Sequence, residues 1–516
     1  MKVILANPPW TPGSCRAASR WPHKKENEFV KPSSLDNIIC TLGRTKDSKE
    51  IVPYSEFPFY LGYAAAILEQ NGHKVKLIDS LVTNQTRNGF LIQVKNYSPD
   101  VIVFETSTPS FKNDIELLKD VSRITKCKKV LCGPHVSALP EETLKSEFVD
   151  FVLIGEYEIS LNNLIECIEK RTNLEDVKGI AFKSGRKVVK TPLQPIVDLD
   201  KLPFPAWHLM PLKRYYNPAP GTKTTMEVMS SRGCPYKCTY CIYPQLMYRT
   251  SQVRFRKPEN VVDEIEILIK KYGKRGIYFN DDTFALTKKH VLAICQEIKK
   301  RRLNFRWACF GRVDTIDYEM LKEMKNAGCV YIQYGVESGS QKILGNIKKG
   351  IRIEQIKNAF KMTYSVGIKA HGTFMIGLPG ESKETIKETM KLISEIDCDS
   401  LVFALCTPFP GTEMYREASE KNWLEESDWE KYDGYNFVVM RTEYMSRKEI
   451  KAAFDYIRKW WEVYRKMRKK DIKRFIKTRY REDGIENLLK VGLSKSIELM
   501  RDVREKKKNL RKMSLN

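Results

Sequence analysis

The strongest constraint on the fold is a repeated alternation of short apolar runs with longer amphipathic segments. In residues 1 to about 170 the apolar runs are KVILAN, KVKLID, VIVFE, KKVLC and DFVLI, and helical patterns lie among them at about 59–71, 87–96, 111–124, 141–147 and 157–170. Continuous apolar runs joined by helices are typical of a parallel sheet covered on both faces. The sequence predicts a doubly wound α/β domain here, and such domains bind ligands at the carboxyl ends of their strands.

A second alternation runs from about residue 222 to 407. The predicted strands are TTMEVMSS, RGIYFND, FRWACFG, CVYIQYG, IKAHGTFMIG and DSLVFALC. Six βα units are too few for the usual eight-fold barrel, so we expect a partial barrel with its chemistry at the carboxyl end of the strands. The predicted domains are 1–175 (Rossmann-like), 176–221 (a hairpin and Pro-rich connector), 222–440 (partial barrel) and 441–516 (basic and helical).

Three cysteines follow the first strand of the predicted barrel. Cys234, Cys238 and Cys241 are spaced C-x3-C-x2-C within SSRGCPYKCTYCIYP. A structural zinc site closes four ligands. Three thiolates can instead bind three irons of a [4Fe–4S] cluster and leave the fourth iron open to a small molecule. Zinc with a remote fourth ligand is the alternative.

The cysteine spacing after the first barrel strand resembles the radical S-adenosylmethionine (SAM) superfamily. The resemblance implies that SAM binds the open iron through its amino and carboxylate groups. One electron from the cluster then cleaves SAM to methionine and a 5′-deoxyadenosyl radical, which abstracts a hydrogen atom. The cofactor carries this chemistry, and the protein supplies position and exclusion of water.

The same resemblance implies roles for residues at the other strand ends. Segments YGVESGS, GRVD, FMIGLPGES and NDDTF occupy the family's positions. The expected SAM contacts are Tyr240, Arg312, Glu337, Ser338 and Gly377. Asp281 and Asp282 are the expected catalytic residues, facing substrate or SAM. Their alternative is capping of the next segment, and the alternative for Arg312 is an ordinary ion pair.

The first domain resembles the cobalamin-binding domain of B12-dependent radical SAM proteins. Its segments NPPW, CGPHVS and VLIGEYE stand in that family's order. The implied cobalamin contacts are Pro8, Pro9, Thr106, Ser107, Gly133, His135, Gly155 and Glu156. The Asp-x-His-x-x-Gly motif that provides a histidine ligand to cobalt elsewhere is absent, so burial and tail contacts are expected to hold the cofactor. Pro244 and Gln245 make the hopanoid and archaeal lipid branch the closest in appearance.

Charge and cysteine usage bear on partners and compartment. The formal net charge is +25, and residues 446–516 carry 24 Lys and Arg against 10 Asp and Glu. Such an excess indicates an anionic partner. Thirteen cysteines scattered through a long chain do not form a disulfide framework, and no run is long and apolar enough to span a bilayer. We expect a cytoplasmic protein with peripheral contact at the inner membrane surface.

The main hypothesis is therefore a radical SAM enzyme that methylates, or rearranges the carbon skeleton of, a lipid or other small molecule with cobalamin. Its expected electron donor is a ferredoxin or flavodoxin, and nucleic acid is not an expected partner. One alternative is a tRNA-modifying methylthiotransferase, although Cys15, Cys40, Cys127, Cys132 and Cys167 are not arranged for a second cluster. The other is a non-catalytic basic metal protein that binds nucleic acid with strong salt dependence.

Overall fold

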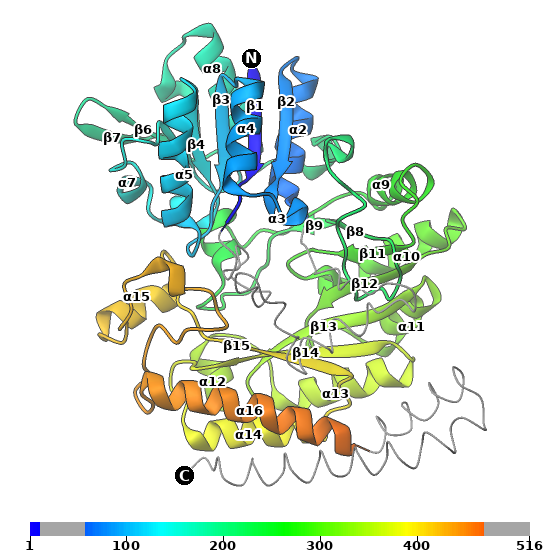
Figure 1. Cartoon of the computed structure of the whole chain (residues 1–516). Coiled ribbons are helices and arrows are strands. Elements are labelled where there is room, and N and C mark those ends of the chain that lie inside the picture. Colours follow the sequence, from blue (N-terminus) through cyan, green and yellow to red (C-terminus); the bar gives the residue numbers. More distant parts are fainter. Residues whose placement is uncertain (11–56, 469–516) are drawn as a thin grey trace, which may run out of the picture.

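The computed structural model describes residues 1–10 and 57–468. Figure 1 shows two sheets, one in each half of the molecule, with the N-terminus at the far end of the first. The first strand enters there and runs toward the second half, so the carboxyl edge of the first sheet faces the second domain.

The first sheet has the strand order β2-β1-β3-β4-β5-β6-β7. The strands are β1 (Lys2–Asn7), β2 (Lys74–Asp79), β3 (Val101–Glu105), β4 (Lys128–Cys132), β5 (Phe151–Leu153), β6 (Ile180–Ser184) and β7 (Lys187–Lys190). The first five are parallel, and the order reverses direction between β1 and β3. Open sheets of this order bind ligands at that switch point, at the carboxyl ends of the strands.

Helices cover both faces of this sheet. They are α2 (Phe59–Gln70), α3 (Ser80–Thr83), α4 (Arg87–Tyr97), α5 (Phe111–Ile124), α6 (Pro134–Ala138), α7 (Pro140–Thr143) and α8 (Glu158–Lys170). Helices α2 and α8 pack together in one core, and α4 and α5 in the other. Almost every residue of α2 is buried, because α2 also packs on Phe57 and on the connector at Pro205. The predicted doubly wound domain is confirmed.

Two local predictions differ from the structure. The helix expected at about 141–147 is replaced by α6 and α7, because Pro134 and Pro140 each begin a short helix of their own. The hairpin expected in the connector does form, but β6 pairs antiparallel with β5. The first sheet thus extends past residue 175.

The second sheet is all-parallel in the order β8-β11-β12-β13-β14-β15. These strands are β8 (Thr225–Val228), β11 (Gly276–Phe279), β12 (Arg306–Gly311), β13 (Cys329–Glu337), β14 (Lys369–Ile376) and β15 (Ser400–Leu405). A separate pair, β9 (Ser231–Arg232) and β10 (Arg254–Phe255), follows β8. The predicted six-stranded partial barrel is confirmed.

The helices of the second domain are α9 (Pro258–Lys270), α10 (Lys288–Lys300), α11 (Tyr318–Asn326), α12 (Gln341–Asn346), α13 (Ile353–Ser365), α14 (Lys383–Glu395), α15 (Glu413–Glu420) and α16 (Arg447–Met467). Amphipathic spacing explains their packing: α9, for example, buries Val261, Val262, Ile265 and Leu268 toward the sheet.

Helix α16 lies along α14, β14 and β15 (Figure 1). Its apolar stripe is buried at Ala453, Phe454, Ile457 and Trp461. The remainder of the basic region, 469–516, lies outside the described residues, as do residues 11–56. Among the helices that are described, none combines the length and apolar character needed to cross a membrane.

Candidate active site

The three cysteines lie in a loop at the carboxyl end of β8, directly after β9. Cys238 is buried, and Cys234 and Cys241 are partly buried. Gly233 opens the loop with φ +106°, and a Cβ there would lie 2.4 Å from the Gln252 carbonyl oxygen, so only glycine fits. The loop therefore presents its thiols from a tightly constrained backbone.

Gln245 holds this loop together. Its Nε2 donates to the carbonyl oxygens of Cys238 (3.2 Å), Thr239 (3.2 Å) and Cys241 (2.8 Å). Its Oε1 accepts from the backbone N–H of Glu413, at the start of α15, at 2.7 Å. The sequence singled out Gln245 only as a point of likeness to a sub-family; the structure shows why an amide is needed there.

Burial affects the protonation of the thiols in this loop. Burial raises the pKa of the Cys234 and Cys241 thiols, and a bound metal ion offsets that effect by stabilising thiolates. In the described part of the chain no three His, Cys, Asp or Glu side chains group as ligands of one metal ion. A cubane does not require such a group, since each thiolate binds a different iron.

Tyr240 and Glu337, both predicted SAM contacts, meet beside the cysteine loop. The Tyr240 hydroxyl donates to Glu337 Oε1 at 3.1 Å. Lys349 Nζ donates to both, at 3.1 Å to the hydroxyl and 2.7 Å to Glu337 Oε1. Glu337 has φ +68°, a conformation that costs a non-glycine residue about 1–3 kcal/mol and clusters at functional sites. Lys349 could not be predicted from the sequence, because its short motif KKG carries no recognisable signal.

Arg312 joins the same group from the end of β12. Its guanidinium lies 3.3 Å from the ring centroid of Tyr236, within the cysteine loop. It forms two hydrogen bonds with Asp314, at 2.9 and 3.1 Å, and one with the Lys349 carbonyl oxygen at 2.8 Å. The ion pair that the sequence left as an alternative is thus present, and the arginine also contacts the cysteine loop.

Ser338 and Gly377 shape backbone at neighbouring strand ends. Ser338 is fully buried, and its Oγ accepts from the Ser340 N–H at 3.2 Å. Gly377 has φ +92° and donates its N–H to Glu381 Oε2 at 2.5 Å. Burial raises the pKa of Glu381 to about 8. The Ser338 hydroxyl also lies 3.3 Å from that of Thr389, in α14, so this residue ties its turn to the helix that follows β14.

Asp281 and Asp282 do not share an environment. Asp281 is buried and accepts from the hydroxyls of Ser230 (2.7 Å) and Ser231 (2.6 Å), which ties β11 to the end of β8. Burial raises its pKa to about 6. Asp282 is partly exposed and accepts from the Gly233 N–H at 2.9 Å. The Asp282 carboxylate is close enough to the Cys234 thiol to raise the pKa of that thiol electrostatically.

The carboxyl edge of the first sheet is rich in hydroxyl groups. Thr106 and Ser110 donate to the buried carboxylate of Asp114 at 2.5 and 2.8 Å, and Ser107 lies in the same turn. Pro8 and Pro9 are buried next to it, and Asn113 donates to the Pro9 carbonyl oxygen at 3.2 Å. The loop after β1 is thereby joined to the first turn of α5, which follows β3.

Gly133 and His135 follow β4 at this edge. Gly133 has φ +107°, and a Cβ there would lie 2.3 Å from the Thr106 carbonyl oxygen. His135 is 1% exposed, with Nδ1 at 3.2 Å from Thr108 Oγ1, while its buried Nε2 has no hydrogen-bond partner in the described structure. Burial lowers its pKa to about 3, so the imidazole is neutral. A buried nitrogen without a partner fits a site shaped for a bound group.

Gly155 and Glu156 lie where the two domains meet. Glu156 pairs with Arg232 (2.8 Å) and Arg254 (2.7 Å), both of the second domain. Arg232 also pairs with Glu158 at 2.7 Å and lies over the rings of Tyr60 and Tyr63. In the structure Glu156 thus fastens the domains together, a contact that sequence reasoning could not supply.

Known protein families match both domains of the chain. A model of the B12 binding domain matches residues 52–165, and one of the Radical SAM superfamily matches residues 228–393. An uncharacterized methyltransferase of Pyrococcus horikoshii is 32% identical over 423 residues, covering 80% of this chain and 89% of that protein. The chain belongs to the B12-binding radical SAM family.

Two further likenesses support this membership. The anaerobic magnesium-protoporphyrin IX monomethyl ester cyclase of Rubrivivax gelatinosus is 29% identical over 407 residues, covering 76% of this chain and 71% of that one. The radical SAM methyltransferase TsrM of Kitasatospora setae, solved with cobalamin and a [4Fe–4S] cluster, shares the fold with TM-score 0.63 and 18% identity over 81% of this chain and 78% of that chain.

As a member of the B12-binding radical SAM family, the protein is an enzyme whose cofactors are a [4Fe–4S] cluster, SAM and cobalamin. The residues present fit them: three thiols on a constrained loop for the cluster, and a polar switch-point edge for cobalamin. The zinc and nucleic-acid alternatives find no better support in these comparisons.

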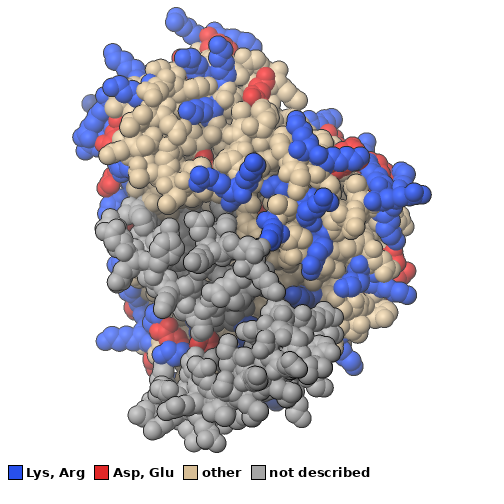
Figure 2. Space-filling view, turned by 45° about the vertical axis from the view of Figure 1, so that its right-hand side comes forward, with Lys and Arg blue, Asp and Glu red and all other residues tan. Residues whose placement is uncertain are grey.

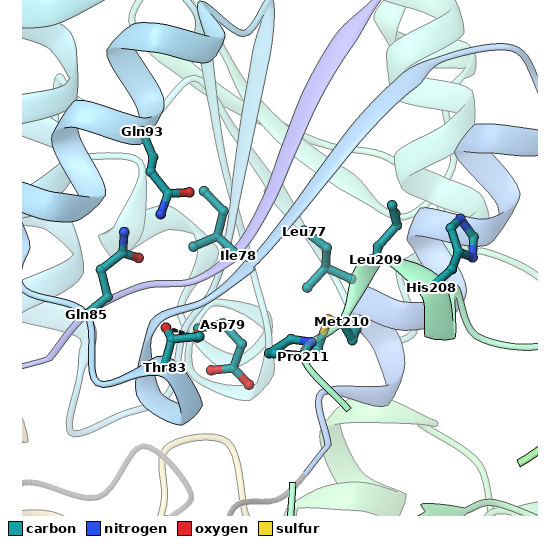
Figure 3. A pocket seen from close by; sticks show the side chains of 10 residues that line it. All are labelled: Leu77, Ile78, Asp79, Thr83, Gln85, Gln93, His208, Leu209, Met210 and Pro211. Atoms are coloured by element: carbon teal, nitrogen blue, oxygen red, sulfur yellow. Dashed lines mark hydrogen bonds between the residues drawn. The ribbon is translucent and has the colours of Figure 1, made fainter. Parts of the chain in front are cut away.

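A separate cavity of about 570 Å³ lies at the outer edge of the first sheet. Figure 3 shows its lining from the end of β2, from Gln85 and Gln93, and from connector residues 208–211. None of these residues is a predicted cofactor contact. Asp79, at its floor, already accepts from the Tyr215 hydroxyl at 2.7 Å and caps α3.

Proposed function

We propose that the protein is a cobalamin-dependent radical SAM methyltransferase that acts on a small organic molecule. The observation that carries this proposal is the junction of the two domains. Arg232 directly precedes the cysteine loop, Glu156 directly follows Gly155, and their side chains pair at 2.8 Å. The predicted cluster site and the predicted cobalamin edge therefore lie next to each other, as transfer between two cofactors requires.

Bound together, the cluster and SAM supply a radical that removes a hydrogen atom from the substrate, and cobalamin supplies a methyl group. The chain's own residues bind and orient. Gln245 and Gly233 fix the backbone of the cysteine loop, and Tyr240 contributes its ring from within that loop. We assign the substrate-facing role to Asp282, which is partly exposed beside Gly233, and a structural role to Asp281.

Carbon-skeleton chemistry is the second candidate, because one relative is named as a cyclase. Methyl-labelled SAM separates the two. In a methyltransferase the label moves into the small-molecule fraction, whereas in a rearrangement or ring closure it stays in methionine. Cell extract of the source organism, freed of protein, serves as the substrate pool.

The enzyme requires a reductant, and we propose a small acidic one-electron carrier such as a ferredoxin or flavodoxin. Figure 2 shows Lys and Arg side chains spread over the visible described surface of both domains, with fewer Asp and Glu. Such a surface attracts an acidic partner and speeds encounter at low salt. A lipid substrate and peripheral membrane contact stay predictions, since they depend on residues 469–516.

The test is anaerobic reconstitution of the full chain with iron, sulfide and cobalamin. We expect about four irons per chain, a corrinoid absorption band and reductant-dependent 5′-deoxyadenosine. Transfer of the label from methyl-labelled SAM to a small molecule would then support the methyltransferase assignment. If the corrinoid band is missing while SAM is still cleaved, the methyltransferase assignment fails and the radical SAM assignment stands.

A further inference from the structure

Two opposite charges are buried together against the cysteine loop. The side chains of Lys349 and Glu337 are 8% and 9% exposed, and they pair at 2.7 Å. Both bond the same atom, the hydroxyl of Tyr240, which stands between Cys238 and Cys241 in the sequence. The pair thus reaches the cysteine loop through a single tyrosine.

The space for this pair is built into the strand. Gly335 lies two residues before Glu337 on β13, and a Cβ there would lie 2.6 Å from Glu337 Oε1 and 2.8 Å from Lys349 Nζ. Arg312 fixes the other side of the lysine by donating to its carbonyl oxygen at 2.8 Å. Two strand ends, of β12 and β13, and the cysteine loop therefore hold Lys349 in place.

The Lys349–Glu337 pair also interacts electrostatically with a cysteine of the loop. Burial lowers the pKa of Lys349, while Glu337 and Cys238 raise it, and the net shift is upward. The ammonium is thus charged and near Cys238. Charges act strongly on one another inside a protein, because the interior screens them far less than water does.

Reduction of a [4Fe–4S] cluster adds one electron, and hence one negative charge, to the site. A nearby cation favours that state and a nearby anion opposes it, so fixed charges adjust the reduction potential. The charges of Lys349 and Glu337 are opposite and lie close together, so the intact pair has little effect on the reduction potential of the cluster. Either charge alone would have a large effect on that potential.

Resting on the proposed function, we propose that Lys349 and Glu337 form a charge pair that sets the reduction potential of the cluster. Lys349 is thereby a positioning and tuning residue that acts through Tyr240 and through its field. The step concerned is the uptake of one electron by the oxidised cluster from a reductant, dithionite in the assay below; no bond forms or breaks in it.

The experiment is a redox titration of the reconstituted full chain, without SAM, followed by the electron paramagnetic resonance signal of the reduced cluster. Lys349→Met leaves the carboxylate alone and should shift the midpoint to more negative potential. Glu337→Gln leaves the ammonium alone and should shift it the opposite way. The double variant should return close to wild type, and Lys349→Arg should stay close to it.

Lys348→Met is the matched control. Lys348 is the preceding residue, but its side chain is 54% exposed and pairs with Glu413 at the surface, so its potential should equal that of wild type. Iron content and a thermal melt accompany every variant. If Lys349→Met assembles no cluster, Glu337→Gln and the double variant still decide the matter.

Shifts of the same sign in both single variants, or no shift in either, overturn the inference, because only a field reverses with the sign of the charge. A wild-type chain that takes up no cluster at all overturns the proposed function instead. The two failures are therefore told apart by iron analysis of the wild-type protein.

Discussion

The two predicted cofactor edges of this molecule are built from different chemistry. The barrel edge gathers buried charges around one short loop: Lys349, Glu337 and Arg312 all contact Tyr236, Tyr240 or each other. The first-sheet edge uses hydroxyls, prolines and a neutral imidazole drawn from three separate loops. A charged cluster and a charged sulfonium need an electrostatic cradle, whereas a large macrocycle is held mainly by shape and dispersed polar contacts. The predictions below separate these two designs.

The largest effect is expected from Cys238→Ala, which breaks only the barrel edge. Removing one of three thiolates should abolish cluster assembly and reduce 5′-deoxyadenosine formation to background. Cobalamin binding should persist, because no residue of the first sheet changes. Iron content, SAM cleavage and the corrinoid band are measured together.

Cys295→Ala, a buried thiol in α10, is the control for Cys238→Ala and should retain both cofactors. SAM cleavage by the Cys238 variant would contradict the cluster assignment.

Arg232→Met breaks the junction between the edges. It leaves the buried carboxylate of Glu158 without its ion-pair partner, while Glu156 keeps only Arg254. Breaking a buried pair in this way costs about 3–5 kcal/mol. We expect a large fall in the denaturation midpoint and loss of coupling between SAM cleavage and methyl transfer. Lys170→Met, which removes an exposed pair with Glu166, should cost about 1 kcal/mol or less. Equal losses in the two variants would remove the special role of the junction.

His135→Gln tests the neutral imidazole of the first-sheet edge. In the folded chain burial lowers the pKa of His135 from 6.5 to about 3. As pH falls below 6.5, the unfolded chain therefore takes up a proton that the folded chain does not, and stability is lost. Between pH 7 and pH 5 this amounts to roughly 2 kcal/mol.

The difference in unfolding free energy between wild type and His135→Gln, followed across that range, should therefore change by about this amount. His290, with its pKa lowered to about 4, accounts for part of the remaining slope. An unchanged pH profile in the His135 variant would show that its imidazole is not held neutral.

Gly133→Ala should weaken cobalamin binding by at least about 10-fold and leave SAM cleavage intact. Its Cβ would press on the Thr106 carbonyl oxygen, and its positive φ costs about 1–2 kcal/mol. Gly72→Ala shares the positive φ, at +80°, but meets nothing within 4 Å. Cobalamin affinity, measured by titration of the corrinoid band, should fall in the Gly133 variant and stay unchanged in the Gly72 variant.

The sequence predicted what depends on local periodicity and missed what depends on pairing at a distance. All six barrel strands and the first five strands of the Rossmann-like domain were readable, because buried parallel strands form continuous apolar runs. The hairpin was readable too, but its attachment to β5 was not, since neither strand carries a signal for its neighbour. Likewise the cysteine spacing is compact, and its cluster could be inferred from it.

Lys349 and Arg232 were out of reach for the same reason. A buried lysine and a surface lysine look alike in KKG. Only the fold shows that Lys349 pairs with Glu337 in the interior while Lys348 lies at the surface. Arg232 precedes the cysteine motif directly, yet its partners are some 75 residues earlier in the other domain, at Glu156 and Glu158. Glu156 was noticed for its position at a strand end, and its ion pairs became visible only with the junction.

The bond from Glu413 to Gln245 has a consequence for biogenesis. The amide that gathers three carbonyls of the cysteine loop is itself held by a residue far later in the chain. During synthesis the cysteine loop lacks this bond until Glu413 has emerged from the ribosome. We therefore expect iron to be inserted only after Glu413 has been made, and a chain truncated before α15 lacks the bond that holds Gln245 against the cysteine loop.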